Sequence, residues 1–287
     1  MSFADVVSLF EESVWMEYVA YFFLFNLAIV LLELGLDFAT RKQRCWKDTG
    51  ANLTIFGFNQ LLDKTFVGWL GLVALMPFQW LAPVAIPMNA WTWVLAIIFA
   101  DLTYYWMHRT EHEHRVLWAN HSVHHSSKDY NLTVSMRLSI VEPLIEWIFL
   151  IPMILMGFNT FQAIVALILV AQYQTWIHTE RVGKLRWLDW WFNTPSVHRV
   201  HHGSNPQYLD KNYGGILMIW DHLFGTYQKE HEKVNYGLNR DIKTNNPIKI
   251  NFIEYWLLWQ DIKQCRSIRD VWRIVFGDLS WRPDYFK

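Results

Sequence analysis

The chain has 287 residues but only two cysteines, Cys45 and Cys265, and they form no CxxC motif. An iron–sulfur centre or a dithiol redox site is therefore not predicted. The patterns GxGxxG and GxxxxGKS/T, which cradle nucleotide phosphates, are missing as well. Electrons for any redox reaction would consequently have to come from another protein, such as a reductase, a ferredoxin or a cytochrome.

Charged residues are scarce too, because they make up 18% of the chain against about 25% in an average soluble domain. Lysine and arginine are absent from residues 1–40, 65–108 and 138–180 and concentrate between and after these blocks. Such cation-free blocks are typical of a protein that crosses the membrane several times. No nucleic-acid partner is predicted.

Apolar runs cover residues 15–36, 61–82, 91–108, 143–157 and 161–177. A membrane helix needs about 20 apolar residues. The run 143–157 is short and contains Pro143 and Pro152, so it forms either a re-entrant leg or a full span. We therefore expect an all-α polytopic membrane protein with four to five membrane helices, one pair of which is re-entrant or spanning.

The positive-inside rule gives a consistent topology for these runs. If the cationic segment after residue 40 is cytoplasmic, the N-terminus and the 83–90 loop, which both lack lysine and arginine, lie on the opposite side. Because the N-terminus has no basic segment, the first run is interpreted as a retained span. Residues 1–287 are expected to form one membrane domain with a cytoplasmic helical cap. The aromatic and basic stretch 183–202 predicts an interfacial helix.

Eight of the twelve histidines fall into three groups with helical spacing: His108 and His112; His121, His124 and His125; His198, His201 and His202. Residues at i, i+3 and i+4 share a helix face, so each group can present its imidazoles to one point. Histidine near a bilayer is costly unless it is ligated or paired. All three groups lie on the predicted cytoplasmic side. Eight imidazoles are too many for one ion, which predicts two metal ions with about four ligands each.

The residue types favour iron over zinc. Structural zinc sites usually include cysteine, whereas imidazole-rich sites with positions open to oxygen fit redox iron. His178 ends the fifth apolar run at the same predicted surface and is expected to be a ninth ligand, with a cap of the helix end as the alternative. Asp101, two helical turns before His108, either orients a histidine through its free N–H or bonds to a neighbouring helix. His114 and His231 are expected at the surface.

The three histidine motifs and their flanking segments resemble the fatty acid hydroxylase/sterol desaturase superfamily, and most of all its alkylglycerol monooxygenase branch. The flanking segments are DLTYYWMHRTEH, LWANHSVHHSSKDYNLT, WIHTE, NTPSVHRVHHG and DKNYGGILMIWDHLFGTY. The resemblance covers roughly residues 95–262. It implies a di-iron, O2-dependent membrane enzyme that hydroxylates or desaturates lipids.

The resemblance also implies that the eight grouped histidines are iron ligands and that His178 occupies a further histidine position of that branch. The branch's dependence on a tetrahydropterin is not carried over to this chain. The N-terminal spans match less clearly, which leaves the substrate and the reductant open.

The leading hypothesis is a membrane-bound monooxygenase that hydroxylates a C–H bond of a lipid reaching the metals through a tunnel between helices. The alternative is a desaturase acting on a sterol-like or other lipid, because both reactions begin with the same hydrogen abstraction. A zinc hydrolase is disfavoured, since residues 108–112 read H-R-T-E-H and not H-E-x-x-H. A non-catalytic scaffold is disfavoured because all eight histidines of the family motifs are present.

Overall fold

The computed structural model describes residues 3–62 and 68–286, and within these residues the chain is helical, with no strand beyond two isolated bridges. The predicted all-α class is confirmed. The helices are α1 (Phe3–Glu12), α2 (Val14–Ala39), α3 (Trp46–Leu62), α4 (Gly68–Leu81), α5 (Ala90–Glu113), α6 (Arg115–His125), η2 (Leu132–Met136), η3 (Glu142–Leu144), η4 (Glu146–Leu150), α7 (Ile151–Leu155), α8 (Thr160–Tyr173), α9 (Leu188–Trp191), α10 (Pro195–His201), α11 (Ile219–Phe224), α12 (Pro247–Gln264) and α13 (Ile268–Phe276).

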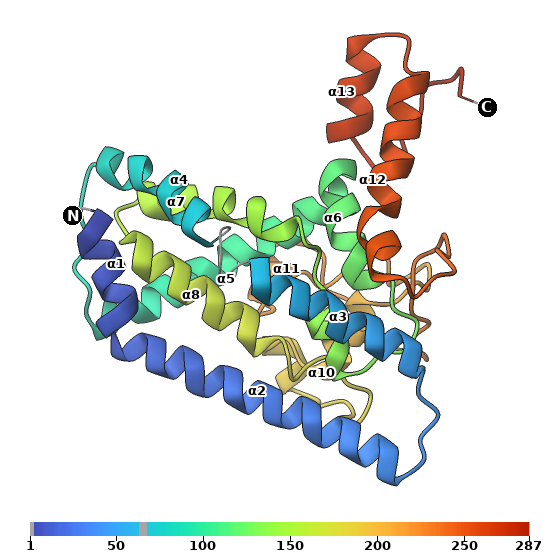
Figure 1. Cartoon of the computed structure of the whole chain (residues 1–287), viewed down its shortest axis with the longest axis horizontal. Coiled ribbons are helices and arrows are strands. Elements are labelled where there is room, and N and C mark those ends of the chain that lie inside the picture. The colour runs from blue at the N-terminus through green and yellow to red at the C-terminus, as the bar shows by residue number, and fades with distance from the viewer. Residues whose placement is uncertain (1–2, 63–67, 287) are drawn as a thin grey trace.

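Helices α2, α4, α5 and α8 form the body of the molecule (Figure 1). Helix α5 packs along α8, α2 lies against another side of α8, and α4 and α7 pack together over them. Small residues such as Ala96 and Ala100 of α5 and Ala163 and Ala166 of α8 are buried in the shared core. Small side chains let two helix backbones approach closely, as in membrane bundles.

Helix α2 has the length and composition of a membrane span, and it is the one such helix among the described residues. Only 17% of its most apolar window is buried, so its apolar side chains face outward. The first predicted span is thus a continuous helix. The chain begins this helix after Ser13, whose hydroxyl oxygen accepts a hydrogen bond from the Trp15 N–H at 3.3 Å.

The other predicted runs are less simple. Helix α5 includes the whole of 91–108, but α4 and α8 have 14 residues each, shorter than a span. Residues 63–67 of the predicted run 61–82 lie outside the described residues. The run 143–157 is divided among η3, η4 and α7. The number of spans and the cytoplasmic position of the cap therefore stay predictions.

The single interfacial helix predicted over 183–202 is not formed. Two short helices, α9 and α10, occupy this stretch, and an extended Phe192 ends the first of them. Pro195 is the first residue of α10, and a proline there disfavours helical backbone in the residue before it. The break matters because it lets α10 enter the interior with its histidines.

The C-terminal helices α12 and α13 form a hairpin that projects from the body, and its base packs on α6 (Figure 1). Arg115 at the start of α6 pairs with Asp261 of α12 at 2.5 Å. His114, between α5 and α6, donates from Nδ1 to the Phe276 carbonyl at 2.7 Å. This hairpin fixes the outer end of the helix that carries three of the grouped histidines.

Candidate metal centre

Nine histidines converge on two points in the interior of the protein. One set contains His108, His112, His121, His125 and His201, and the other contains His124, His178, His198 and His202. Within each set the potential ligand nitrogens all lie within 4.8 Å of one another. These are the eight histidines of the three sequence motifs together with His178. No other described His, Cys, Asp or Glu belongs to either set.

Two of the motifs contribute to both points. In the H-x-x-H-H motif of α6, His121 and His125 join the first set, whereas His124 joins the second. The motif of α10 is divided the other way, because His198 and His202 join the second set and His201 the first. The expectation that each group presents its imidazoles to one point is therefore wrong for these two motifs. An i, i+4 pair serves one point, and the i+3 residue, which is turned away by about 60°, serves the other.

The distances between the Nε2 atoms fit ligands of a common ion. His108 and His121 are 3.0 Å apart at these atoms, and so are His125 and His201. In the second set, the Nε2 of His178 lies 3.0 to 3.2 Å from those of His124, His198 and His202. Two nitrogens that are each about 2.1 Å from one metal, at a right angle, are about 3 Å apart.

For three of the histidines, hydrogen bonds to the main chain fix the tautomer and leave the Nε2 atom without a proton. The Nδ1 atoms of His108, His178 and His201 bond to the main-chain carbonyls of Tyr213, Gln174 and Lys211 at 2.9, 2.7 and 2.9 Å. A carbonyl only accepts, so each Nδ1 carries the hydrogen and each Nε2 has a lone pair. Lone pairs that converge in this way repel one another unless a cation lies between them.

Burial reinforces the need for a cation. None of the nine histidines is more than 7% exposed. Burial lowers the pKa of His201 to about 3 and that of His178 to about 4, so both are neutral at neutral pH and able to bind metal. The Nε2 of His112 is buried without a hydrogen-bond partner. The donor set thus fits a transition-metal ion that accepts imidazole.

Carboxylates outside the two sets lie within ion-pair distance of two of the histidines, His112 and His121. An oxygen of Glu111 lies 3.1 Å from Nδ1 of His121, and the other oxygen accepts from the Asn120 amide at 3.3 Å. Asp210 lies 3.5 Å from Nδ1 of His112. Such partners orient an imidazole and raise its basicity as a ligand.

The structure places Asp101 in the second of its two predicted roles. Its carboxylate accepts from the N–H groups of Ile216 and Leu217 at 2.6 and 3.0 Å and from the Trp220 indole of α11 at 2.9 Å. Both oxygens are therefore used by the segment leading into α11, and no described contact joins Asp101 to a histidine. The expectation that Asp101 orients a histidine directly is corrected accordingly.

The carboxylate of a second residue, Asp221, fixes the segment that contacts the first histidine set. It accepts from the N–H groups of Tyr213 and Gly214, both at 2.8 Å, and from the Thr226 hydroxyl at 2.7 Å. Tyr213 supplies the carbonyl that fixes His108. Burial raises the pKa of Asp221 to about 6. Asp101 and Asp221 together anchor residues 213–217 beside the first set.

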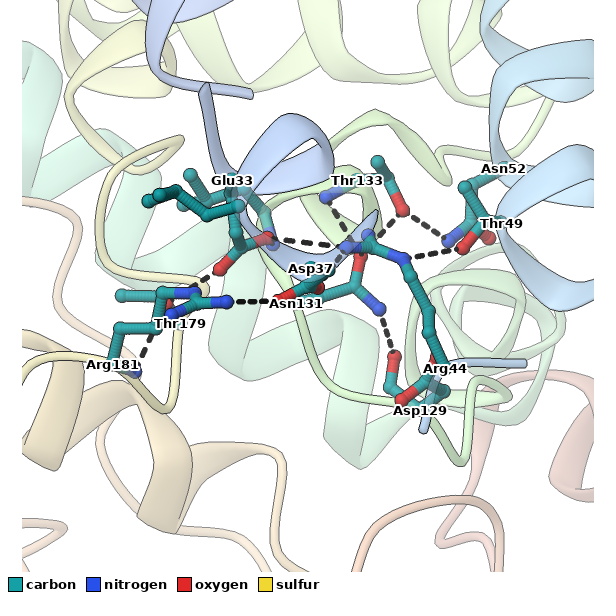
Figure 2. Close-up of polar contacts among 12 residues, drawn as sticks. Glu33, Asp37, Arg44, Thr49, Asn52, Asp129, Asn131, Thr133, Thr179 and Arg181 are labelled. Atoms are coloured by element: carbon teal, nitrogen blue, oxygen red, sulfur yellow. Dashed lines mark hydrogen bonds and ion pairs between the residues drawn. The ribbon is translucent and has the colours of Figure 1, made fainter. Parts of the chain in front are cut away.

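The second set is tied to α2 by a buried polar network (Figure 2). Glu33 accepts from the Thr179 hydroxyl at 2.7 Å and from the Leu132 N–H at 2.8 Å. Asp37, one turn further along α2, pairs with Arg44 and Arg181. Because Thr179 follows His178 directly, the network fixes the segment that carries this histidine. Glu33 is an acidic residue within the apolar run 15–36, and such a residue is a signal of function that the sequence already contains.

An apolar cavity of about 640 Å³ lies between α2, α3, α4 and α8. Phe23, Phe56, Leu72 and Ile168 are among the residues that line it, one from each helix. It also reaches Thr175, whose carbonyl accepts from the His178 N–H at 3.3 Å. The cavity thus ends within one turn of the second set.

Comparison with known proteins points to one family. The model of the fatty acid hydroxylase family matches residues 93–226, which include all nine histidines. An alkylglycerol monooxygenase of Danio rerio is 44% identical over 196 residues, which are 68% of this chain and 44% of the relative. One of Xenopus tropicalis is 37% identical over 268 residues, 92% of this chain and 58% of the relative.

A more distant relative comes from a bacterium. An ornithine lipid hydroxylase of Rhizobium tropici is 34% identical over 155 residues, 53% of this chain and 44% of the relative. The chain therefore spans about half the length of the curated relatives it matches. No solved structure is significantly similar to it.

Proposed function

Since residues 93–226 place the chain in the fatty acid hydroxylase family, with alkylglycerol monooxygenases among its relatives, we propose that it is a membrane-bound di-iron monooxygenase. It uses O2 to hydroxylate a C–H bond of a lipid. The observation that carries the proposal is the convergence of nine buried histidines on two adjacent points. An imidazole-only donor set fits iron, and structural zinc commonly takes cysteine as well.

In this proposal the first set of five histidines holds one iron and the second set of four holds the other. Bound iron would supply the redox chemistry that O2 requires, with electrons from an external protein donor. The protein's own contribution is to orient the imidazoles through the carbonyls of Tyr213, Gln174 and Lys211 and to exclude bulk water by burial. Rigid ligands of this kind need little reorganisation during the reaction.

The proposed substrate is a lipid with a long alkyl or acyl chain. The cavity between α2, α3, α4 and α8 is large and apolar enough for part of such a chain, and at Thr175 it comes within one turn of His178. The exposed apolar surface of α2 supports a position in the bilayer, with the histidines towards the cytoplasm. A lipid could then enter the cavity from the membrane without crossing water.

Metal analysis of the purified protein tests the centre itself. We expect about two iron ions per chain, because each set offers at least four nitrogens. One zinc ion without iron would contradict the proposal. Replacing His124 with alanine should abolish lipid oxidation, whereas unchanged turnover would favour a scaffold without catalysis.

Lipid analysis under 18O2 tests the reaction. Cells that express the chain should accumulate a lipid that carries one labelled oxygen atom more than the corresponding lipid of cells that lack the chain. A lipid lighter by two hydrogens and without label would favour the desaturase instead.

A further inference from the structure

The last helix of the chain, α13, has an exposed apolar face formed by Ile268, Trp272 and Phe276. These residues follow one another at i, i+4 and i+8, so they share one side of the helix. They are 85%, 65% and 47% exposed. Ile274, on the opposite side of the helix, is fully buried. Large apolar side chains gathered on one exposed face indicate an interaction surface.

Positive charges border this α13 face. Arg269 and Arg273 are exposed, and each directly follows a residue of the face in the helix, from which it is turned by about 100°. The carboxylate of Asp270 accepts hydrogen bonds from the hydroxyls of Ser267 and Tyr285, both at 2.7 Å. A helix with aromatic residues on one side and arginines beside them is typical of the surface of a membrane with anionic lipids.

The position of α13 along α5 suits such a surface. Helix α5 has 24 residues and is therefore about 36 Å long. His114 follows α5, and its Nδ1 donates to the Phe276 carbonyl at 2.7 Å. A bilayer has a hydrocarbon core about 30 Å thick and measures about 40–45 Å with its headgroups. If α5 crosses the bilayer, as its apolar run predicts, and Ala90 lies at one boundary of the core, then Phe276 lies in the opposite headgroup layer.

The direction of the hairpin fits the same position. Figure 1 shows that the hairpin of α12 and α13 runs across the direction of α2, which is the helix with the length and composition of a span. An element that runs across a span lies along the membrane surface. In the same view, α13 lies on the side of α12 that is nearer to the start of α2. The bilayer would therefore be on the α13 side of the hairpin.

We propose that the α13 face docks on the headgroup layer of the bilayer that α2 enters, and that Arg269 and Arg273 bind anionic lipid headgroups there. The occupant is the lipid surface and not a protein, because the depth along α5, the direction of the hairpin and the bordering charges all fit a bilayer. The surface lies outside residues 93–226, which match the hydroxylase family, and the lipids it binds are not substrates. The inference thus goes beyond the proposed function.

The docked hairpin would hold the helix that carries three of the histidines. Its base packs on α6, and Asp261 of α12 pairs with Arg115 at the start of α6 at 2.5 Å. The Phe276 carbonyl holds His114 between α5 and α6. A membrane contact at α13 would therefore limit the motion of α6 relative to the spans.

Fluorescence of the full chain in lipid vesicles tests the docking. An environment-sensitive NBD fluorophore is attached at Ile268→Cys in a chain in which Cys45 and Cys265 are replaced with serine. Lys233→Cys is the control position, because Lys233 is exposed in the polar loop between α11 and α12. The vesicles contain phosphatidylcholine alone or with roughly a third phosphatidylglycerol, which is anionic. Quenching by lipids brominated on their acyl chains reports direct contact with the bilayer.

In anionic vesicles the label at residue 268 should emit at shorter wavelength and be quenched by brominated lipid, whereas the label at residue 233 should not. Each arginine should raise the ratio of docked to undocked protein about fivefold. Arg269→Gln with Arg273→Gln should therefore remove most of the preference for anionic vesicles. Arg240→Gln is the matched control, because it removes an exposed cation outside the hairpin, and it should keep the preference.

A label at residue 268 that stays in water in anionic vesicles would overturn the inference. Equal docking with and without phosphatidylglycerol, or an unchanged preference in the arginine variant, would do so too. A shift to shorter wavelength without quenching, which grows with the number of chains per vesicle, would show that a second copy covers the face instead. Neither readout needs bound iron or turnover, so a failure of the proposed function leaves this test intact.

Discussion

The two histidine sets differ in the number of ligands that they offer. The first set has five histidines and the second has four. Loss of one imidazole leaves four nitrogens in the first set but only three in the second. Since protein-bound metal ions usually keep four or more ligands, the second set has no ligand to spare.

His198→Ala is therefore expected to lower bound iron from about two ions per chain to about one or fewer, whereas His112→Ala keeps about two. Mass spectrometry of the purified variants measures the metal. His114→Ala is the control, because His114 lies outside both sets and bonds to Phe276. Equal iron in the His112 and His198 variants would contradict the division into five and four.

The carboxyl group of Asp221 leads to a prediction about how stability depends on pH. Burial is the main cause that raises its pKa from 3.8 to about 6. A raised pKa means that the folded state holds the proton more tightly, so the stabilisation is complete below about pH 3.8 and is lost as the pH rises through about 6. A shift of this size corresponds to about 3 kcal/mol.

Asp221→Asn cannot ionise and should not show this loss. The difference in thermal stability between wild type and variant should therefore move in favour of the variant between pH 4 and pH 7, whatever its starting value. Thermal unfolding in detergent across this range measures it. A difference that stays constant with pH would show that Asp221 is not the group responsible.

The residues of the centre could be predicted better than their partners. Grouped histidines stand out in a sequence because few other functions need them, and all nine that were singled out converge. Their Nδ1 partners could not be predicted, since Tyr213, Gln174 and Lys211 contribute carbonyls, which every residue has. Asp101 was recognised as unusual, but spacing alone could not show that its partners are Ile216, Leu217 and Trp220.

At the scale of helices, the division of the two H-x-x-H-H motifs between the two sets could not be predicted from the sequence. Helical spacing gives the angle between His121 and His124, but not whether the metal lies on one side of the helix or on both. The answer depends on where α5, α6, α10 and the turn after α8 meet. The short helix α10 could not be predicted either, because the aromatic and basic residues around it indicated one longer helix at the membrane surface.

The prediction at the scale of helices concerns Glu33 of α2. Glu33→Gln keeps the size of the side chain, but the new amide has one acceptor oxygen for two donors, Thr179 and Leu132. The segment with His178 should loosen, and iron should leave the second set several-fold faster in the presence of a chelator. Glu17→Gln is the control on the same helix, because Glu17 is exposed. Equal rates of iron loss would contradict a role for the network in Figure 2.

For the whole molecule, the sequence predicted an all-helical protein with a histidine-rich metal site, and the described residues are helical and bring nine histidines together. The spans are harder to predict, because hydropathy measures how apolar a run is and not whether it is one helix. Pro143 and Pro152 turn the run 143–157 into short pieces, whereas α2 remains continuous.

The sidedness of the molecule can be tested with its own cysteines. Cys45 is exposed and follows α2 in the segment predicted to be cytoplasmic. In a Cys265→Ser background, a membrane-impermeant maleimide should label Cys45 in inverted vesicles but not in intact cells. Ala85→Cys, in a chain that lacks both native cysteines, should show the opposite pattern, since residue 85 is exposed in the loop between α4 and α5. Labelling of Cys45 from outside would reverse the proposed topology.

The division of the motifs has a consequence for how the centre behaves over time. His124 and His125 are neighbours in the chain, as are His201 and His202, and each pair has one residue in each set. In the proposed di-iron centre, each of these two pairs would link the ions through adjacent residues of one helix or its end. Because the peptide unit between such residues is planar and stiff, the main chain would limit how far the two ions can move apart during oxidation and reduction.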